Sequence, residues 1–139
     1  MKYVLDASVA VKWAVPEADS GKALVLQDEF RNQVHELIAP DTFPIEIAHA
    51  LMRAERRGIL VQGEALPKIL DIVQLGPKLH AYLPLLPRAA EISSQMRIGV
   101  YDCLYLALAE REDCEMLTAD MNLVARAGQH FSIVLLTSL

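Results

Sequence analysis

Residues 3–13 read YVLDASVAVKW, an apolar stretch interrupted by one carboxylate at Asp6. The residues before Asp6 suit a short buried strand, and the residues after it suit a helix that Pro16 stops. An ionised carboxylate between two buried segments is costly unless hydrogen-bond donors or a cation compensate it. The nearest downstream cation in the sequence is Lys12, so we expect the compensation for Asp6 to come from elsewhere in the chain.

Short apolar segments alternate with helix-like segments through the rest of the chain. This alternation predicts an α/β fold whose mainly parallel central sheet has helices on both faces. A length of 139 residues fits a single domain over residues 1–139. The expected strands are 2–5, 37–39, 79–83, 116–118 and 133–136, and the expected helices are 7–15, 19–34, 43–57, 62–75, 86–98, 101–112 and 121–127.

Composition narrows the class of protein. No apolar run approaches the roughly 18 residues of a membrane span, and the N-terminus lacks signal-peptide features, so we expect a cytoplasmic protein that does not enter a membrane. Cys103 and Cys114 form no metal-binding spacing and are expected to be ordinary buried thiols. The net charge of −5 argues against a nucleic-acid binder, unless several of the acids bind cations.

Four carboxylates stand in apolar surroundings, whereas Glu110, Glu112 and Asp113 cluster in polar, helix-terminal sequence. The four are Asp6 in VLDAS, Glu46 in FPIEIAHAL, Asp102 in GVYDCLYLALA and Asp120 in MLTADMNL. Asp6 and Asp120 each follow an expected strand, and in open α/β sheets the functional sites form at the carboxyl ends of the strands. Glu46 and Asp102 fall near the starts of expected helices, which favour anions.

Four poorly hydrated acids without basic neighbours would repel one another. Mg²⁺ or Mn²⁺ removes this repulsion because both ions prefer carboxylate oxygens, and such a site can bind a phosphodiester through its metals. We therefore interpret Asp6 as a metal ligand. Spacing alone leaves a second interpretation open, in which the four acids are helix caps and strand-end hydrogen-bonders that never meet.

The order and surroundings of these acids resemble the PIN-domain family, especially its VapC-type toxins. VLDASVAVKW resembles the family's first motif, APDTFPIEIAHAL its second, YDCLYLALAE its third and TADMNLVARAG its fourth. The resemblance covers essentially the whole chain and implies a three-layer α/β/α PIN-like fold. One departure is visible, because His49 stands where relatives often have Asn, three residues after Glu46.

The resemblance implies an endoribonuclease that needs Mg²⁺ or Mn²⁺ and hydrolyses RNA with a metal-activated water. It is expected to be the toxin of a toxin–antitoxin pair, to form a homodimer and to bind a small antitoxin protein that covers its cleft. In this interpretation the four acids, Asp6, Glu46, Asp102 and Asp120, are both the catalytic residues and the metal ligands, with Ser8 and Thr118 as supporting hydroxyls.

Other functions fit the sequence less well. Lys12, Arg53 and Arg57 are candidate RNA contacts, although the two arginines equally suit a solvated helix end. Glu46 and His49 form one Glu-x-x-His pair, whereas a di-iron bundle needs two. The text after the first strand lacks the GxGxxG of a dinucleotide-binding fold. The remaining alternative is a non-catalytic PIN-like module that binds RNA or protein.

Overall fold

The computed structural model describes residues 1–17 and 19–139. A five-stranded parallel sheet in the order β3-β2-β1-β4-β5 forms the centre, as the alternating pattern predicts. The strands are β1 (Lys2–Leu5), β2 (Glu36–Pro40), β3 (Lys78–His80), β4 (Glu115–Thr118) and β5 (Ile133–Leu135).

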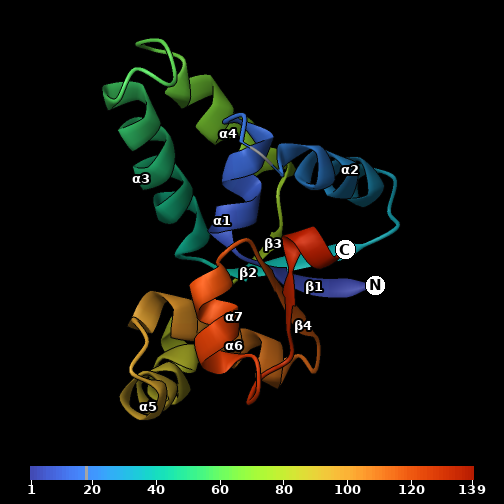
Figure 1. Cartoon of the computed structure of the whole chain (residues 1–139), viewed down its shortest axis with the longest axis vertical. Coiled ribbons are helices and arrows are strands. Elements are labelled where there is room, and N and C mark those ends of the chain that lie inside the picture. Colours follow the sequence, from blue (N-terminus) through green and yellow to red (C-terminus); the bar gives the residue numbers. More distant parts are fainter. Residues whose placement is uncertain (18) are drawn as a thin grey trace.

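Helices cover both faces of this sheet, which confirms the expected three-layer α/β/α arrangement. In Figure 1 the helices α1 to α4 lie above the sheet and α5 to α7 lie below it. The helices are α1 (Ala7–Ala10), α2 (Ser20–Arg31), α3 (Phe43–Arg56), α4 (Ala65–Leu75), α5 (Leu86–Met96), α6 (Val100–Arg111) and α7 (Met121–Ala127), with 3₁₀ turns η1 (Val11–Trp13), η2 (Leu83–Leu85) and η3 (Leu136–Ser138).

The core lies where β1 and α6 meet. Tyr3, Val4 and Leu5 of β1 are buried, and so is every residue of α6 from 103 to 109. A helix that is apolar on all sides has to be surrounded by other elements. Accordingly, α6 packs against α5 and against β1, β2 and β4.

Several elements are shorter than the sequence predicts, for identifiable backbone reasons. Helix α2 ends at Arg31 rather than near residue 34, and Gln33 then adopts a left-handed φ of 62°. Helix α4 starts at Ala65 rather than residue 62, after Gly63 takes a φ of 88°, which glycine tolerates best. Strand β3 ends at His80 because the chain then enters the 3₁₀ turn η2.

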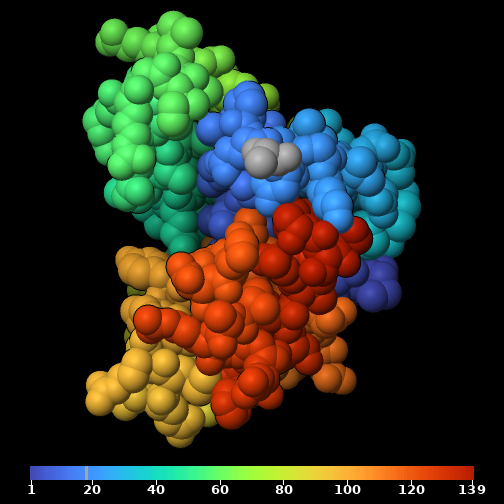
Figure 2. Space-filling view, viewed as in Figure 1, coloured from blue at the N-terminus to red at the C-terminus, as the bar shows by residue number. Residues whose placement is uncertain are grey.

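The end of the chain packs beside the first half of the molecule. Figure 2 shows the red C-terminal residues against the blue residues of α2, where Lys22 Nζ donates to the carbonyls of Thr137 and Leu139 at 2.6 and 2.9 Å. None of the helices in the described residues is long and apolar enough to cross a membrane.

Candidate active site

The candidate site lies at the carboxyl end of the sheet, where the strand order reverses. Chain connections run from β1 to β2 on one side, whereas β4 pairs with β1 on the other side. Crevices in open α/β sheets form at this switch point. Asp6 directly follows β1, and Asp120 follows β4 by two residues, so both carboxylates lie at this edge.

All four carboxylates of interest line one cavity of about 620 Å³ there. Beside them, the wall contains Val11, Ile45, Ala50 and Tyr101, so it is mainly apolar. His49 also lines the cavity, but no Lys or Arg among the described residues does. The structure therefore brings together Asp6, Glu46, Asp102 and Asp120, which removes the interpretation in which they never meet.

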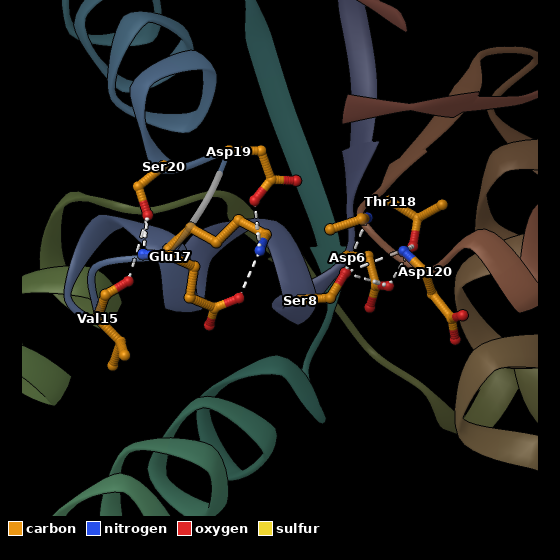
Figure 3. Close-up of polar contacts among 10 residues, drawn as sticks. Asp6, Ser8, Val15, Glu17, Asp19, Ser20, Thr118 and Asp120 are labelled. Carbon is orange, nitrogen blue, oxygen red and sulfur yellow. Dashed lines mark hydrogen bonds and ion pairs between the residues drawn. The ribbon is translucent and has the colours of Figure 1, made fainter. Parts of the chain in front are cut away.

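Asp6 is compensated by hydroxyl groups rather than by a basic side chain. Its Oδ2 atom accepts from Thr118 Oγ1 at 2.7 Å and from Ser8 Oγ at 2.8 Å. The same two hydroxyls accept in turn, Thr118 from the amide of Asp120 and Ser8 from the amide of Ala119. Figure 3 shows Asp6, Ser8, Thr118 and Asp120 gathered in this network. The expected supporting hydroxyls thus contact the first acid.

Glu46 has a similar pair of donors from other elements. Its Oε2 atom accepts from Tyr105 Oη at 2.8 Å and from Thr42 Oγ1 at 3.1 Å. Tyr105 is fully buried in α6, whereas Thr42 immediately precedes α3 and makes no capping bond to that helix. Glu46 itself lies in the first turn of α3, where the helix end favours a negative charge.

Asp102 and Asp120 differ in how they are held. Asp120 caps α7, because its Oδ1 atom accepts from the amides of Asn122 and Leu123 at 2.9 and 3.3 Å. Asp102 lies in the first turn of α6, and within the described residues its carboxylate accepts no side-chain hydrogen bond. Asp120 is thus held by hydrogen bonds to one of its oxygens, whereas the position of Asp102 is set by the backbone of α6.

Burial and the neighbouring negative charges disfavour the charged forms of Asp6, Glu46 and Asp102. The pKa of Glu46 rises to about 7, chiefly because the carboxylate is buried; the charges of Asp6 and Asp102 add to this rise, and the hydroxyl donors Tyr105 and Thr42 oppose it. Burial also raises the pKa of Asp102 to about 6, with help from the charges of Asp6 and Asp120. For Asp6, burial raises the pKa against the hydrogen bonds from Thr118 and Ser8. The four acids therefore share one electrostatic environment.

The chemistry of this donor set fits a hard divalent cation. Mg²⁺ and Mn²⁺ prefer carboxylate oxygens, and their charge would relieve the repulsion that raises these pKa values. As the side chains lie, no three Asp, Glu, His or Cys residues within 1–17 and 19–139 are close enough together to enclose a metal ion. The residues thus match such an ion in ligand type and charge, although they do not form a preassembled coordination shell.

The three candidate RNA contacts lie in different settings. Lys12 is buried, and its Nζ pairs with Glu17 Oε2 and Asp19 Oδ1, each at 2.6 Å. Figure 3 shows Glu17 and Asp19 turned toward each other on the side of α1 away from Thr118. Because its ammonium is paired with these two carboxylates, Lys12 could contact an RNA phosphate only if these ion pairs were given up.

The two arginines remain exposed on α3 and just beyond its end. Arg53 Nη2 lies 3.2 Å from Nε2 of His49, which itself lines the cavity. Arg53 and Arg57 follow Glu46 by 7 and 11 residues, which places them on the same side of the helix at about 10 and 16 Å along its axis. A cationic rim therefore extends from the cavity along α3.

Sequence reasoning missed two residues of the site, Tyr105 and Thr42. Thr42 suggests an ordinary helix cap, because a threonine before a helix usually has that role. Tyr105 suggests core packing, because the surrounding helix is aliphatic. Its hydroxyl is a signal in itself, since a buried phenol usually has a hydrogen-bond partner.

Comparison with known proteins gives a consistent assignment. The PIN domain family model matches residues 3–129. Ribonuclease VapC3 of Pyrobaculum aerophilum is 32% identical over 128 residues, which cover 91% of this chain and 95% of that protein. Ribonuclease VapC1 of Mycobacterium tuberculosis is 33% identical over 135 residues, which cover 89% of this chain and 93% of that protein.

Two solved structures share the fold. PAE2754 from Pyrobaculum aerophilum superposes with a TM-score of 0.65 at 20% identity, covering 91% of this chain and 87% of that chain. VapBC2 from Rickettsia felis, solved with a DNA fragment from its promoter, gives a TM-score of 0.64 at 15% identity, covering 96% of this chain and 98% of that chain. At these identities, the likeness establishes the fold alone.

Proposed function

The chain belongs to the PIN domain family, and on that premise we propose that it is a divalent-metal-dependent endoribonuclease, the toxin of a toxin–antitoxin pair. The observation that carries this proposal is the cavity at the carboxyl end of β1 and β4, lined by four acids and by no Lys or Arg of the described residues. Two relatives that match nearly end to end are named ribonucleases, which supports RNA as the substrate.

We assign the metal to the four acids. Asp6, Glu46 and Asp102 are the principal ligands, and Asp120 contributes through the oxygen that does not cap α7. Bound Mg²⁺ or Mn²⁺ supplies the positive charge that lets an acidic cavity accept a phosphodiester and stabilises the charge that develops during its hydrolysis.

The chain itself holds and shields these carboxylates. Ser8 and Thr118 hold one oxygen of Asp6, which limits its rotation and favours its charged form. Val11, Ile45 and Ala50 place apolar groups in the cavity wall beside the carboxylates. Electrostatic interactions are stronger beside such apolar groups than at a fully hydrated surface.

We propose that the RNA backbone follows α3. Arg53 is exposed beside His49 at the rim of the cavity, and Arg57 continues the same side at the helix end. Both can pair with phosphates on either side of the cleavage position. In this chain His49 would support Arg53 where many relatives have Asn.

The partners and location complete the proposal. We propose a small antitoxin protein that covers the cavity, a homodimer, a single domain over residues 1–139 and a cytoplasmic location. These four statements rest on the likeness to toxins of the VapC type, because the contacts described above are all within one chain.

The test is cleavage of end-labelled RNA near neutral pH. Wild type, Asp102→Asn and Asp71→Asn would each be incubated with Mn²⁺ or with EDTA. Asp102 lines the cavity, whereas Asp71 is an exposed acid on α4, so the two substitutions make the same chemical change at different places. We expect cutting by wild type and Asp71→Asn with Mn²⁺ only, and at least about 100-fold slower cutting by Asp102→Asn.

Other outcomes discriminate between the alternatives. Cleavage by Asp102→Asn at the wild-type rate would make the site assignment wrong. Equal cutting in EDTA would contradict the metal dependence. RNA binding without any cutting, and without Mn²⁺ binding, would favour a non-catalytic module.

A further inference from the structure

One tyrosine hydroxyl reaches the site from inside the core. Tyr105 is fully buried in α6, and its Oη donates to Glu46 Oε2 at 2.8 Å. Figure 1 shows α6 below the sheet and α3 above it, so this hydrogen bond joins helices from opposite layers at the carboxyl end of the sheet.

The contact repeats a pattern found at two other acids of the cavity. In each case two donors hold a single carboxylate oxygen. Glu46 Oε2 is held by Thr42 and Tyr105, Asp6 Oδ2 by Thr118 and Ser8, and Asp120 Oδ1 by the amides of Asn122 and Leu123.

The second oxygen of Glu46 is left for another partner. Among the described residues, no group donates a hydrogen bond to Glu46 Oε1. Because Glu46 lines the cavity, this oxygen is available to a ligand bound there. Two donors on one oxygen restrict the rotation of the carboxylate plane, so they also determine where the other oxygen points.

We propose that Tyr105 is a positioning residue that holds Glu46 in the orientation needed to ligate a divalent cation. This inference rests on the proposed metal-dependent function and adds a residue of the core to it. A phenylalanine would fill the same space in α6, so the hydroxyl group is the part of the side chain that acts on the site.

A purely structural role is the competing explanation. The same hydrogen bond connects α3 to α6, and its loss could simply weaken the packing between the layers. The two roles differ in what they change: a structural role lowers thermal stability without metal, whereas a positioning role lowers the affinity for the metal.

The experiment compares Tyr105→Phe with Tyr3→Phe. Tyr3→Phe is the matched control, because it makes the same chemical change at a tyrosine that is buried in β1 and whose hydroxyl contacts no acid of the cavity. The Mn²⁺ dissociation constant of each full-length protein would be measured without RNA, from the electron paramagnetic resonance signal of free Mn²⁺. Melting temperatures would be measured in EDTA, and cleavage at low and saturating Mn²⁺.

We expect Tyr105→Phe to raise the Mn²⁺ dissociation constant by about 10-fold, the lower end of what loss of a ligand-orienting bond costs. Cleavage should fall by a similar factor at low Mn²⁺ and recover at saturating Mn²⁺, while Tyr3→Phe behaves as wild type. An unchanged dissociation constant, with or without a lower melting temperature in EDTA, would overturn the inference. If wild type itself bound no Mn²⁺, the proposed function would fail first, and the inference with it.

Discussion

At the scale of single residues, neighbouring groups determine whether a cationic side chain stabilises the fold or is available to bind a ligand. Lys12 and Arg53 lie near the same cavity wall, since Val11 and His49 next to them line it. Lys12 is only 9% exposed and has two carboxylate partners, whereas Arg53 is exposed beside a histidine. A cation contributes to RNA affinity only when phosphate can reach it.

Replacement of each cation by glutamine should therefore separate the two roles. We expect Arg53→Gln to weaken RNA binding and to reduce the slope of log affinity against log salt by about 0.7, the value for one phosphate contact on a single strand. Lys12→Gln should leave that slope unchanged and lower the melting temperature, because Glu17 and Asp19 lose their partner. Fluorescence anisotropy of labelled RNA at several salt concentrations, with Ca²⁺ in place of Mn²⁺, measures both slopes. Equal slopes for wild type and Arg53→Gln would exclude Arg53 from the RNA path.

At the scale of elements, a short helix depends on an acid of the site. Helix α7 has seven residues, and Asp120 accepts hydrogen bonds from its second and third amides. A helix this short is unstable alone, so its cap and its packing of Leu123 and Ala127 keep it in place. Asp120 thus has a structural role through one oxygen and a proposed ligand role through the other.

Asparagine and alanine at this position should distinguish the two roles. Asparagine is as good a cap as aspartate, so Asp120→Asn should leave the free energy of unfolding in EDTA nearly unchanged, while Asp120→Ala should lower it by about 1 kcal/mol. Cleavage should decrease in both variants, because both lose the charge. Urea denaturation gives the stabilities. If Asp120→Asn retained full cleavage, capping would be the whole role of Asp120.

At the scale of the whole molecule, the acids of the cavity oppose folding when no metal is bound. The pKa of Glu46 rises from its ordinary value of 4.5 to about 7, and that of Asp102 from 3.8 to about 6. The folded protein therefore keeps protons that the unfolded chain has already released. For such raised pKa values, stability is present at low pH and is lost as the pH rises through the folded-state values.

We expect the free energy of unfolding in EDTA to fall as the pH rises from about 5 to about 7.5. Glu46→Gln should reduce this fall, because the amide does not titrate. Mn²⁺ should restore stability at the upper end of the range in wild type, since a ligand that binds only the folded state stabilises it. Urea titrations across this pH range provide the measurement. A flat profile for wild type in EDTA would show that the acids do not share a poorly hydrated site.

The sequence predicts the elements of this fold well and its contacts only in part. The bounds of β1, α3 and α7 could be predicted from local signals in the sequence. These signals are apolar runs, Pro44 near the start of a helix, and residues that end helices. Asp6 and Asp120 could be placed at the carboxyl edge because each follows a strand. The partners of Glu46 and Lys12 could not be predicted, because they depend on how side chains from separate elements pack across the sheet edge.

The hydrogen bond from Thr118 to Asp6 joins residues 112 positions apart in the chain. Strands β1 and β4 can pair only after residues 115–118 have been synthesised. Until then, Asp6 lacks the hydrogen bond from Thr118. Chains grow at roughly 5 to 20 residues per second, which makes this delay many seconds long. The candidate site therefore cannot form on the growing chain before Thr118 and Asp120 have been made.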